Sequence, residues 1–597
     1  MCSEPKPPDP VEESKRRSRP DVAARKARNK LLDFTGVVLK WNTLCKDEVI
    51  QSHLEQFVWN INKVALEAYH VVNMHILRCL SHNIPLPTLD QNFFYRCCSG
   101  VVEKRGEHTS EPNTGDVDLD ATLVIFKSLR PKKNYKPPTK ENMAFLMCNL
   151  ARQMNVACRN HLVLNFGKRL IRYVRLKYDK SKKEAWYFVN KAFQPNGPKT
   201  RDEHEFAEWL GYAPYENVID RNFVHFLQKS YDILRFMEAQ PANTRGARTF
   251  TMMPLKSGFV LSHITICSSC LQQILQTIVK SNEGVSFLGH TNITKQVFDA
   301  KKDTFWRSLF DIDTYETENR KFAYELSTNG YAVTLRMQKP KREHPENPQP
   351  IHEEDYERLM GADPGVDYVL TARTNTGEFV QVSTAEYRHM AQMRKQMRWN
   401  ENIKKRNITY AQAIKEMPSF AITNDESYKT ALSHVLTQCD DLLSFCANKA
   451  FRKWRFKTYV YSKVALTKLC KRLTDGKKTC IGIGDWSRQD GIIKRHPTAP
   501  VKKIQKELHR HAKVVSLDEY GTSRGCSCCG GKCIKIKLPK QNKEGVVELS
   551  RSHQVVRCSS NECAMCWQRD MNSSINHLKL LMCLLRNEER PAYMRRT

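Results

Sequence analysis

The stretch VVSLDEYGTSRGCSCCG, residues 514–530, decides how the second half of the chain is expected to fold. Its apolar start, residues 514–517, predicts a strand, and the preceding residues 501–511 predict a helix. Glu519 stands at the end of that strand. Cys526 and Cys529 follow as a C-x₂-C pair, a spacing typical of metal ligands. An acidic strand end is therefore expected close to a thiol cluster.

The rest of the thiol cluster comes after an intervening segment. Cys558 with either Cys563 or Cys566 supplies a second pair, and four thiolates at this spacing suit tetrahedral zinc. Residues 534–557 between the two pairs are interpreted as a loop with too little apolar content to fold without metal. The sequence thus predicts one structural Zn²⁺.

The remaining cysteines point to a reducing environment. The chain has 21 cysteines and starts without an apolar signal segment, so free or metal-bound thiols are expected rather than disulfides. A second C-x₂-C, Cys267 and Cys270, lies in an apolar stretch with no further pair nearby. That context favours two core residues.

Two further acidic residues stand at expected element boundaries. Asp363 lies in the sequence GADPG, residues 361–365, directly before an expected hairpin of residues 368–373 and 379–382. Asp570 opens an apolar helix that continues through Leu584. Taken singly, each acid would more often be a helix cap or a surface charge.

The order of these elements makes the acids informative. A hairpin, a helical insertion, a strand at residues 480–483, a helix, a strand and an acidic helix follow the plan of a ribonuclease-H-like fold, in which carboxylates from separate elements meet at the sheet's edge. Crowded like charges need divalent cations between them. Two Mg²⁺ ions roughly 4 Å apart, held by Asp363, Glu519 and Asp570, would then activate a water and stabilise the leaving oxygen in phosphodiester cleavage.

Net charge restricts the class of partner. The 597 residues include 96 Lys and Arg against 64 Asp and Glu, a formal net charge of +32, which requires a polyanion such as nucleic acid. A membrane-spanning helix is not expected, because the most apolar long stretch, residues 260–279, is interrupted by Ser, His and Gln.

Upstream, the sequence predicts a multidomain α+β protein. Residues 34–41 indicate a strand, and helical periodicity dominates from Val49 to about residue 250. Four prolines mark residues 339–354 as a linker. The first thirty residues are a charged tail whose basic run suits nuclear import or simple contact with phosphates.

A long basic helical region, residues 385–473, interleaves charged and aromatic side chains. Such side chains on neighbouring turns can bind phosphates and stack on bases, although aromatic residues packed inward from a solvated helix are the plain alternative. The candidate nucleic-acid-binding residues are Arg394, Lys395, Arg398, Trp399, Arg452, Lys453, Trp454 and Arg455.

The motifs around residues 361–370, 514–530 and 558–576 resemble the RuvC nuclease and embedded zinc ribbon of TnpB proteins, and more closely their eukaryotic relatives, the Fanzor nucleases. The specific match covers roughly the last 240 residues. The resemblance implies a helical recognition lobe, a β-rich wedge domain and an RNase-H-like RuvC domain. The implied divisions are a disordered basic tail at 1–30, a wedge domain at 31–45 and 250–355, a recognition lobe at 46–249, a RuvC domain at 356–520 with a helical insertion at 385–473, a zinc ribbon binding target nucleic acid at 521–566, and a RuvC C-terminal helix and tail at 567–597.

The family's functional residues carry over with one exception. The resemblance places its first and last aspartates on Asp363 and Asp570, and its zinc ligands on Cys526, Cys529, Cys558 and Cys563. Prokaryotic relatives carry the glutamate where this chain has Gly484. In Fanzor-like proteins it is relocated to the next strand, which implies Glu519, with Asp485 as the competing candidate.

The implied activity is RNA-guided DNA cleavage next to a short flanking motif, by a monomeric protein in a nuclear ribonucleoprotein with guide RNA and target double-stranded DNA. Two rivals remain open. An unguided transposase or resolvase would use the same carboxylates, and a catalytically dead DNA-binding regulator would keep only the zinc ribbon.

Overall fold

The computed structural model describes residues 32–103, 112–132, 135–139, 143–194, 197–198, 200–256, 258–341, 351–365, 367–484, 500–541, 545 and 547–596. The chain divides into two compact units, Met1–Arg342 with Lys404–Lys453, and Glu343–Ile403 with Trp454–Thr597. The first division falls within the expected linker. The basic tail expected at residues 1–30, and linker residues 342–350, lie outside the described part.

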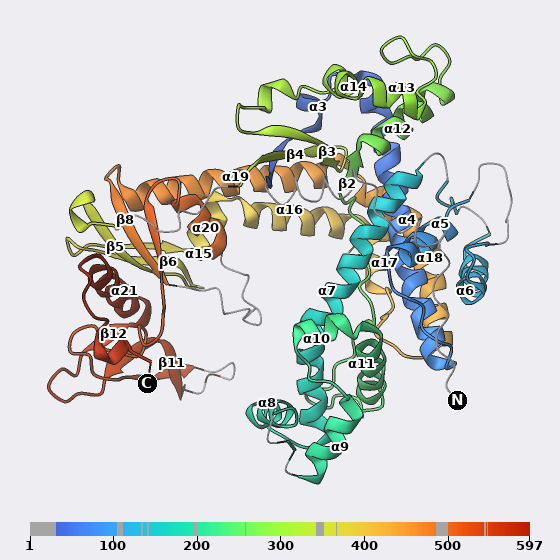
Figure 1. The fold of residues 1–597 in the computed structure, drawn as a ribbon. Coiled ribbons are helices and arrows are strands. Elements are labelled where there is room, and N and C mark those ends of the chain that lie inside the picture. The colour runs from blue at the N-terminus through green and yellow to red at the C-terminus, as the bar shows by residue number, and fades with distance from the viewer. Residues whose placement is uncertain are drawn as a thin grey trace, which may run out of the picture. The chain divides into compact units, whose positions relative to one another are not determined.

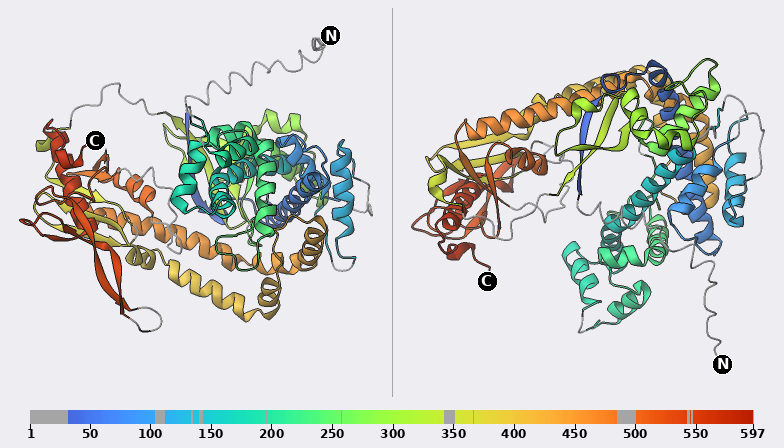
Figure 2. Two further views of the ribbon diagram at one scale, coloured as in Figure 1. Left: turned by 90° about the horizontal axis from the view of Figure 1, so that it is seen from below. Right: turned by 45° about the horizontal axis from the view of Figure 1, so that its top comes forward.

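The first unit is largely helical, as the periodicity predicts (Figures 1 and 2). Its helix α4 begins where the Asp47 carboxylate accepts a hydrogen bond of 2.8 Å from the Ile50 backbone N–H. The helices are α3 (Trp41–Leu44), α4 (Glu48–Ser81), α5 (Gln91–Gly100), α6 (Val117–Ser128), α7 (Ala144–Lys177), α8 (Lys182–Lys191), α9 (Arg201–Leu210), α10 (Glu216–Arg221), α11 (Phe223–Glu238), α12 (Ser268–Ser281), α13 (Lys295–Ala300), α14 (Lys302–Leu309), α17 (Ile408–Lys415) and α18 (Asp425–Cys446).

The first unit also contains a four-stranded antiparallel sheet of order β1-β4-β3-β2. Its strands are β1 (Leu32–Lys40), β2 (Ile264–Cys267), β3 (Lys321–Thr328) and β4 (Ala332–Pro340). β1 pairs with β4 over its whole length, from Leu32↔Pro340 to Lys40↔Ala332. A strand from before the long helical block and strands from beyond it therefore form one sheet.

Part of the helical insertion packs into this first unit. The buried ammonium of Lys63 on α4 lies 2.6 Å from the Asp440 carboxylate on α18, and His70 lies 3.1 Å from the Tyr428 hydroxyl. The expected insertion at 385–473 is thus divided, because residues 404–453 group with the first unit and its two ends group with the second.

The second unit is built on a five-stranded mixed sheet of order β7-β6-β5-β8-β9. β5 pairs antiparallel with β6 but parallel with β8, and β8 pairs parallel with β9. The elements are β5 (Arg358–Asp363), β6 (Tyr368–Thr374), β7 (Phe379–Ser383), α15 (Thr384–Met390), α16 (Met393–Arg406), α19 (Lys449–Thr474), β8 (Thr479–Gly484), α20 (Val501–Leu508), β9 (Lys513–Leu517), β10 (Cys533–Gln541), β11 (Val547–Cys558), β12 (Cys566–Gln568) and α21 (Arg569–Leu585).

Helices cover both faces of this sheet. Met360 and Ala362 pack with Leu469 of α19 on one face, whereas Leu359 packs with Leu581 of α21 on the other. Successive side chains of a strand point to opposite faces, so odd-numbered residues of β5 face α21. Gly361 is one of them, and a Cβ added there would lie only 2.0 Å from the Leu578 backbone nitrogen. Glycine therefore lets α21 lie directly against β5.

Two sequence predictions about this unit are corrected. Residues 358–363 form the strand β5, so Asp363 ends a strand and does not lie in a turn before the first one. Residues 534–557, interpreted as a loop, instead form most of the β10–β11 hairpin, with Cys533 paired to Cys558. Across the described residues, no helix combines the length and apolarity that crossing a bilayer requires.

Candidate functional site

Asp363 lies at the C-terminal end of β5, in the middle of the sheet. Pleating places it on the same face as Leu359 and Gly361, which is the face covered by α21. Its side chain keeps 17% of its surface exposed. The carboxylate is therefore mostly buried beneath a helix, at the edge of the sheet where β5 ends.

Glu519 follows β9, and its carboxylate fills the space above the end of β8. A Cβ added to Gly484 would lie 2.5 Å from the Glu519 Oε1 atom and 2.7 Å from its Cγ atom. The two strands are parallel, with Gly484 opposite Leu517. A side chain at position 484 and the observed carboxylate at 519 thus exclude one another.

The competing acids differ in position. Asp518 is engaged in ion pairs, because its carboxylate lies 3.0 Å from Arg596 and 3.6 Å from Arg590. Asp485 lies outside the described residues. Among the described acids next to this strand end, Glu519 is the one that faces α21.

Asp570 is in the first turn of α21, where the Gln568 side chain accepts a hydrogen bond of 2.8 Å from the Met571 backbone N–H. A carboxylate in a first turn is stabilised by the helix dipole. Asp570 also reaches the loop after β5, since a Cβ added to Gly365 would lie 3.5 Å from its Oδ2 atom. The three predicted acids therefore come from β5, the end of β9 and α21.

Electrostatics couples these acids. Burial raises the pKa of Asp363 well above its ordinary value, and the negative charges of Asp570 and Glu519 raise it further. Burial also raises the pKa of Asp570, although Arg569 opposes the shift. A bound divalent cation would relieve this repulsion, so the oxygen donors suit Mg²⁺.

His577 belongs to the same cluster and was not predicted from the sequence. Its Nδ1 atom lies 4.0 Å from the Asp363 Oδ1 atom, and its Nε2 atom lies 2.8 Å from the Cβ that Gly484 lacks. The ring is fully buried, neither nitrogen has a hydrogen-bond partner among the described residues, and burial lowers its pKa to about 4. Its position two helical turns after Asp570 places both on one face of α21, which is the signal that could have identified it.

Four cysteines converge as the spacing predicts. Sγ atoms of Cys526, Cys529, Cys558 and Cys563 all lie within 4.8 Å of one another, and no other set of three or more metal-binding side chains among the described residues is so close. Cys526 lies 3.8 Å from Cys563, and Cys529 lies 3.4 Å from Cys558. Tetrahedral zinc with bonds of ~2.3 Å separates sulfurs by about 3.8 Å, so this group could hold Zn²⁺. Cys566 is exposed and outside the group.

The surroundings of the thiol group favour thiolates. The Trp567 indole N–H donates to the Cys526 sulfur at 3.2 Å, and the Gly531 backbone N–H donates to Cys529 at 3.4 Å. A Cβ at position 531 would lie 3.0 Å from the Cys558 sulfur and 3.2 Å from the Cys529 sulfur, so glycine allows the backbone to lie close to both thiols. Such donors stabilise the thiolate charge next to a metal.

The thiol group is attached to the same helix that carries Asp570. Asn572 of α21 accepts a hydrogen bond of 2.8 Å from the Ser527 backbone N–H and donates to the Gly525 carbonyl at 2.9 Å. Lys579 donates to the Ser527 carbonyl at 2.7 Å. The cysteine loop and the acidic cluster are therefore held by one helix.

The expected nucleic-acid-binding residues divide into two groups. Arg394, Lys395, Arg398, Lys453 and Arg455 are exposed on α16 and α19, and the rings of Trp399 and Trp454 lie 6.0 Å apart. The expectation that Arg452 binds nucleic acid is corrected. Arg452 is buried and donates hydrogen bonds to the Asn329 carbonyl at 2.7 Å and to the Ala447 carbonyl at 2.8 Å. It stabilises the first unit and cannot reach a phosphate.

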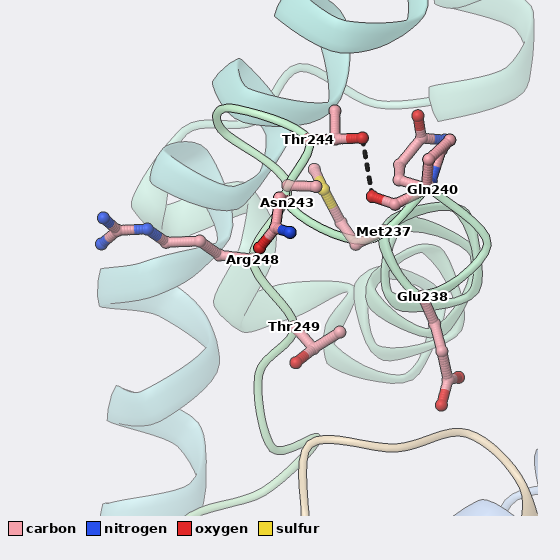
Figure 3. Close-up of a pocket in the computed structure, with 9 residues that line it drawn as sticks. Met237, Glu238, Gln240, Asn243, Thr244, Arg248 and Thr249 are labelled. Carbon is pink, nitrogen blue, oxygen red and sulfur yellow. Dashed lines mark hydrogen bonds between the residues drawn. The ribbon is translucent and has the colours of Figure 1, made fainter.

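A pocket of about 580 Å³ lies elsewhere in the first unit, around the turn after α11 (Figure 3). In that turn the Thr244 hydroxyl donates to the Pro241 carbonyl at 2.7 Å. The lining includes Glu238 and Arg248, which point away from one another in Figure 3. It gathers no cluster of acids or thiols and is not the candidate site.

Comparisons with solved structures find distant likeness to Cas12 proteins in complexes with RNA. The chain is similar to Cas12f1 in complex with sgRNA and target DNA, with a TM-score of 0.23 and 12% identity over 92% of this chain and 99% of that chain. It is similar to AacC2c1 in complex with sgRNA, with a TM-score of 0.27 and 11% identity over 92% of this chain and 89% of that chain. It is also similar to CasPhi-2 bound to crRNA, with a TM-score of 0.22 and 12% identity over 49% of this chain and 59% of that chain. No family model and no curated protein matches the chain. Because these TM-scores are far below 0.5, the likeness establishes neither fold nor activity.

Proposed function

We propose that the protein is an RNA-guided DNA endonuclease of the Fanzor type that cleaves target DNA next to a short flanking motif. The main support for nuclease activity is the position of the Glu519 carboxylate next to Gly484. There it adds a third carboxylate to the face of the sheet that holds Asp363 and Asp570. The RNA-guided part rests on the resemblance of the motifs and on the +32 charge.

In the proposed reaction, Asp363, Glu519 and Asp570 hold two Mg²⁺ ions. When bound, the ions supply an activated water and stabilise the leaving oxygen. The acids would position that site from β5, from the residues that follow β9 and from α21, with the buried, neutral ring of His577 packed beside them.

The four-cysteine group is proposed to hold structural Zn²⁺ that shapes the ribbon and takes no part in hydrolysis. Exposed Arg394, Lys395 and Arg398 on α16, with Lys453 and Arg455 on α19, are proposed to contact nucleic-acid phosphates. We further propose that the protein binds a guide RNA and target double-stranded DNA and that it acts in the nucleus.

Single substitutions test the nuclease. Asp363→Ala, Glu519→Ala and Asp570→Ala should each abolish Mg²⁺-dependent DNA cleavage by the purified ribonucleoprotein while DNA binding persists. Asp518→Ala is the matched control and should cut normally, since Asp518 pairs with Arg590 and Arg596. Normal cutting by the Glu519 variant would refute the assignment of the third acid.

Sequencing of copurifying RNA tests guidance. A discrete structured RNA should accompany the protein, and its removal should abolish cleavage. Full cleavage after complete removal would instead favour an unguided transposase or resolvase, and binding without any cleavage would favour a DNA-binding regulator.

A further inference from the structure

The second C-x₂-C pair belongs to the core of the first unit, as its apolar setting predicts, and its two thiols also lie beside one another. Cys267 is the last residue of β2 and is half-buried, whereas Cys270 is fully buried in the first turn of α12. Their Sγ atoms lie 3.5 Å apart. A disulfide needs about 2.05 Å, so an approach of about 1.5 Å would join them.

The two thiols have different environments. The Asn149 side chain of α7 donates to the Cys270 sulfur at 3.2 Å and to the Thr265 carbonyl at 3.1 Å, which ties the pair to β2. Cys267 stands at the N-terminus of α12, where backbone N–H groups lack partners in the helix and favour negative charge. One thiol is thus half-buried and next to a helix N-terminus, and the other is fully buried 3.5 Å from it.

We propose that Cys267 and Cys270 form a thiol–disulfide exchange site, in which Cys267 is the attacking thiolate and the substrate is a low-molecular-weight disulfide such as glutathione disulfide. This proposal is independent of the proposed nuclease function, because both residues lie in the first unit and outside the acidic cluster and the four-cysteine group.

The exchange balances without a further reagent. The Cys267 thiolate attacks one sulfur of the disulfide, a mixed disulfide forms, and one thiolate leaves. Cys270 then gives up its proton and attacks the Cys267 sulfur, which closes the Cys267–Cys270 bond and releases the second thiol. Two protein thiols are oxidised, and one external disulfide is reduced to two thiols.

The environments of the two thiols agree with these roles. The hydrogen bond from the Cys270 thiol, with help from the backbone amides of Cys270 and Ser269, outweighs burial and lowers the pKa of Cys267 to about 5. The same hydrogen bond and burial raise the pKa of Cys270 far above its usual range. Of the two thiols, Cys267 is therefore the one that ionises more readily, and the thiolate is the reactive form.

Peptide mapping of the full-length protein tests the proposal directly. Trypsin cuts after Lys256 and Lys280, and the fragment 257–280 contains these two cysteines and no other. After equilibration with excess glutathione disulfide, this fragment should carry an internal disulfide, a loss of about 2 Da that dithiothreitol reverses. In reduced protein, iodoacetamide should modify Cys267 at least about tenfold faster than the buried Cys158.

Two variants sharpen the test. Cys270→Ser should trap glutathione on Cys267, whereas Cys267→Ser should form neither the adduct nor the disulfide. A fragment that stays fully alkylatable in the wild-type protein under excess glutathione disulfide would overturn the proposal. So would a disulfide from Cys270 to Cys148, which lies on α7, or protection of both thiols by zinc that a chelator removes.

Discussion

Replacing Gly484 by Ala tests the placement of Glu519 without removing any acid. The new Cβ would lie 2.5 Å from Glu519 Oε1 and 2.8 Å from His577 Nε2. Cβ atoms do not approach heavy atoms so closely, so the carboxylate must move by about 1 Å. Misplacing a catalytic group by that amount costs roughly a hundredfold in rate, while overpacking costs about 1–3 kcal/mol of stability.

The assay is single-turnover cleavage of a labelled DNA duplex by the ribonucleoprotein at saturating Mg²⁺, with thermal unfolding measured in parallel. Gly167→Ala is the control, because Gly167 lies inside α7 with nothing within 4 Å of an added Cβ. The double variant Gly484→Glu with Glu519→Ala returns a carboxylate to β8 and should cut better than Glu519→Ala alone. A Gly484→Ala protein that is folded and cleaves at the wild-type rate would refute the reasoning.

Three further predictions concern metal, the corrected arginine and pH. Cys563→Ser should lose about one bound zinc per chain in a metal-content assay, whereas Cys566→Ser should retain it; equal loss in both would exclude the ligand set. Arg452→Ala should lower the free energy of unfolding by about 2–4 kcal/mol, because it leaves the buried Asn329 carbonyl and the part-buried Ala447 carbonyl without this donor. Lys453→Ala should instead weaken RNA binding in a filter assay and leave denaturant unfolding unchanged. Burial lowers the pKa of His70 from 6.5 to about 4, so the neutral ring stabilises the folded state. This stabilisation, about 3 kcal/mol, is complete above pH 6.5 and is lost as the pH falls toward 4. His70→Gln should therefore flatten that part of the curve of unfolding free energy against pH. An unchanged slope would contradict it.

Long periodic segments could be predicted from the sequence, but the strand that carries Asp363 could not. β5 has six residues, includes Gly361 and no β-branched residue, and is covered on both faces. A strand buried on both faces shows no alternation of apolar and polar residues. Its register became visible only through the parallel pairing with β8.

Site residues whose place follows from the order of the strands and helices could be predicted from the sequence. Residues whose role depends on contacts between distant parts of the chain could not. Glu519 could be inferred because the neighbouring parallel strand ends beside the vacant position. From the sequence, buried Arg452 could not be distinguished from exposed Lys453, because the Asn329 carbonyl that accepts the hydrogen bond of Arg452 belongs to a distant part of the chain. His577 could not be predicted as a site residue, because the sequence does not distinguish a histidine in an apolar helix from an ordinary core residue.

The mutual exclusion of a side chain at Gly484 and the carboxylate of Glu519 makes these positions a reciprocal pair. A homologue could hold its acid on either strand, provided that the other strand offers glycine. A search that demands an acid at one fixed alignment column would therefore discard such proteins as inactive. Scoring the two columns together, one acid and one glycine, would retain them and would also guide transfer of the acid between strands by design.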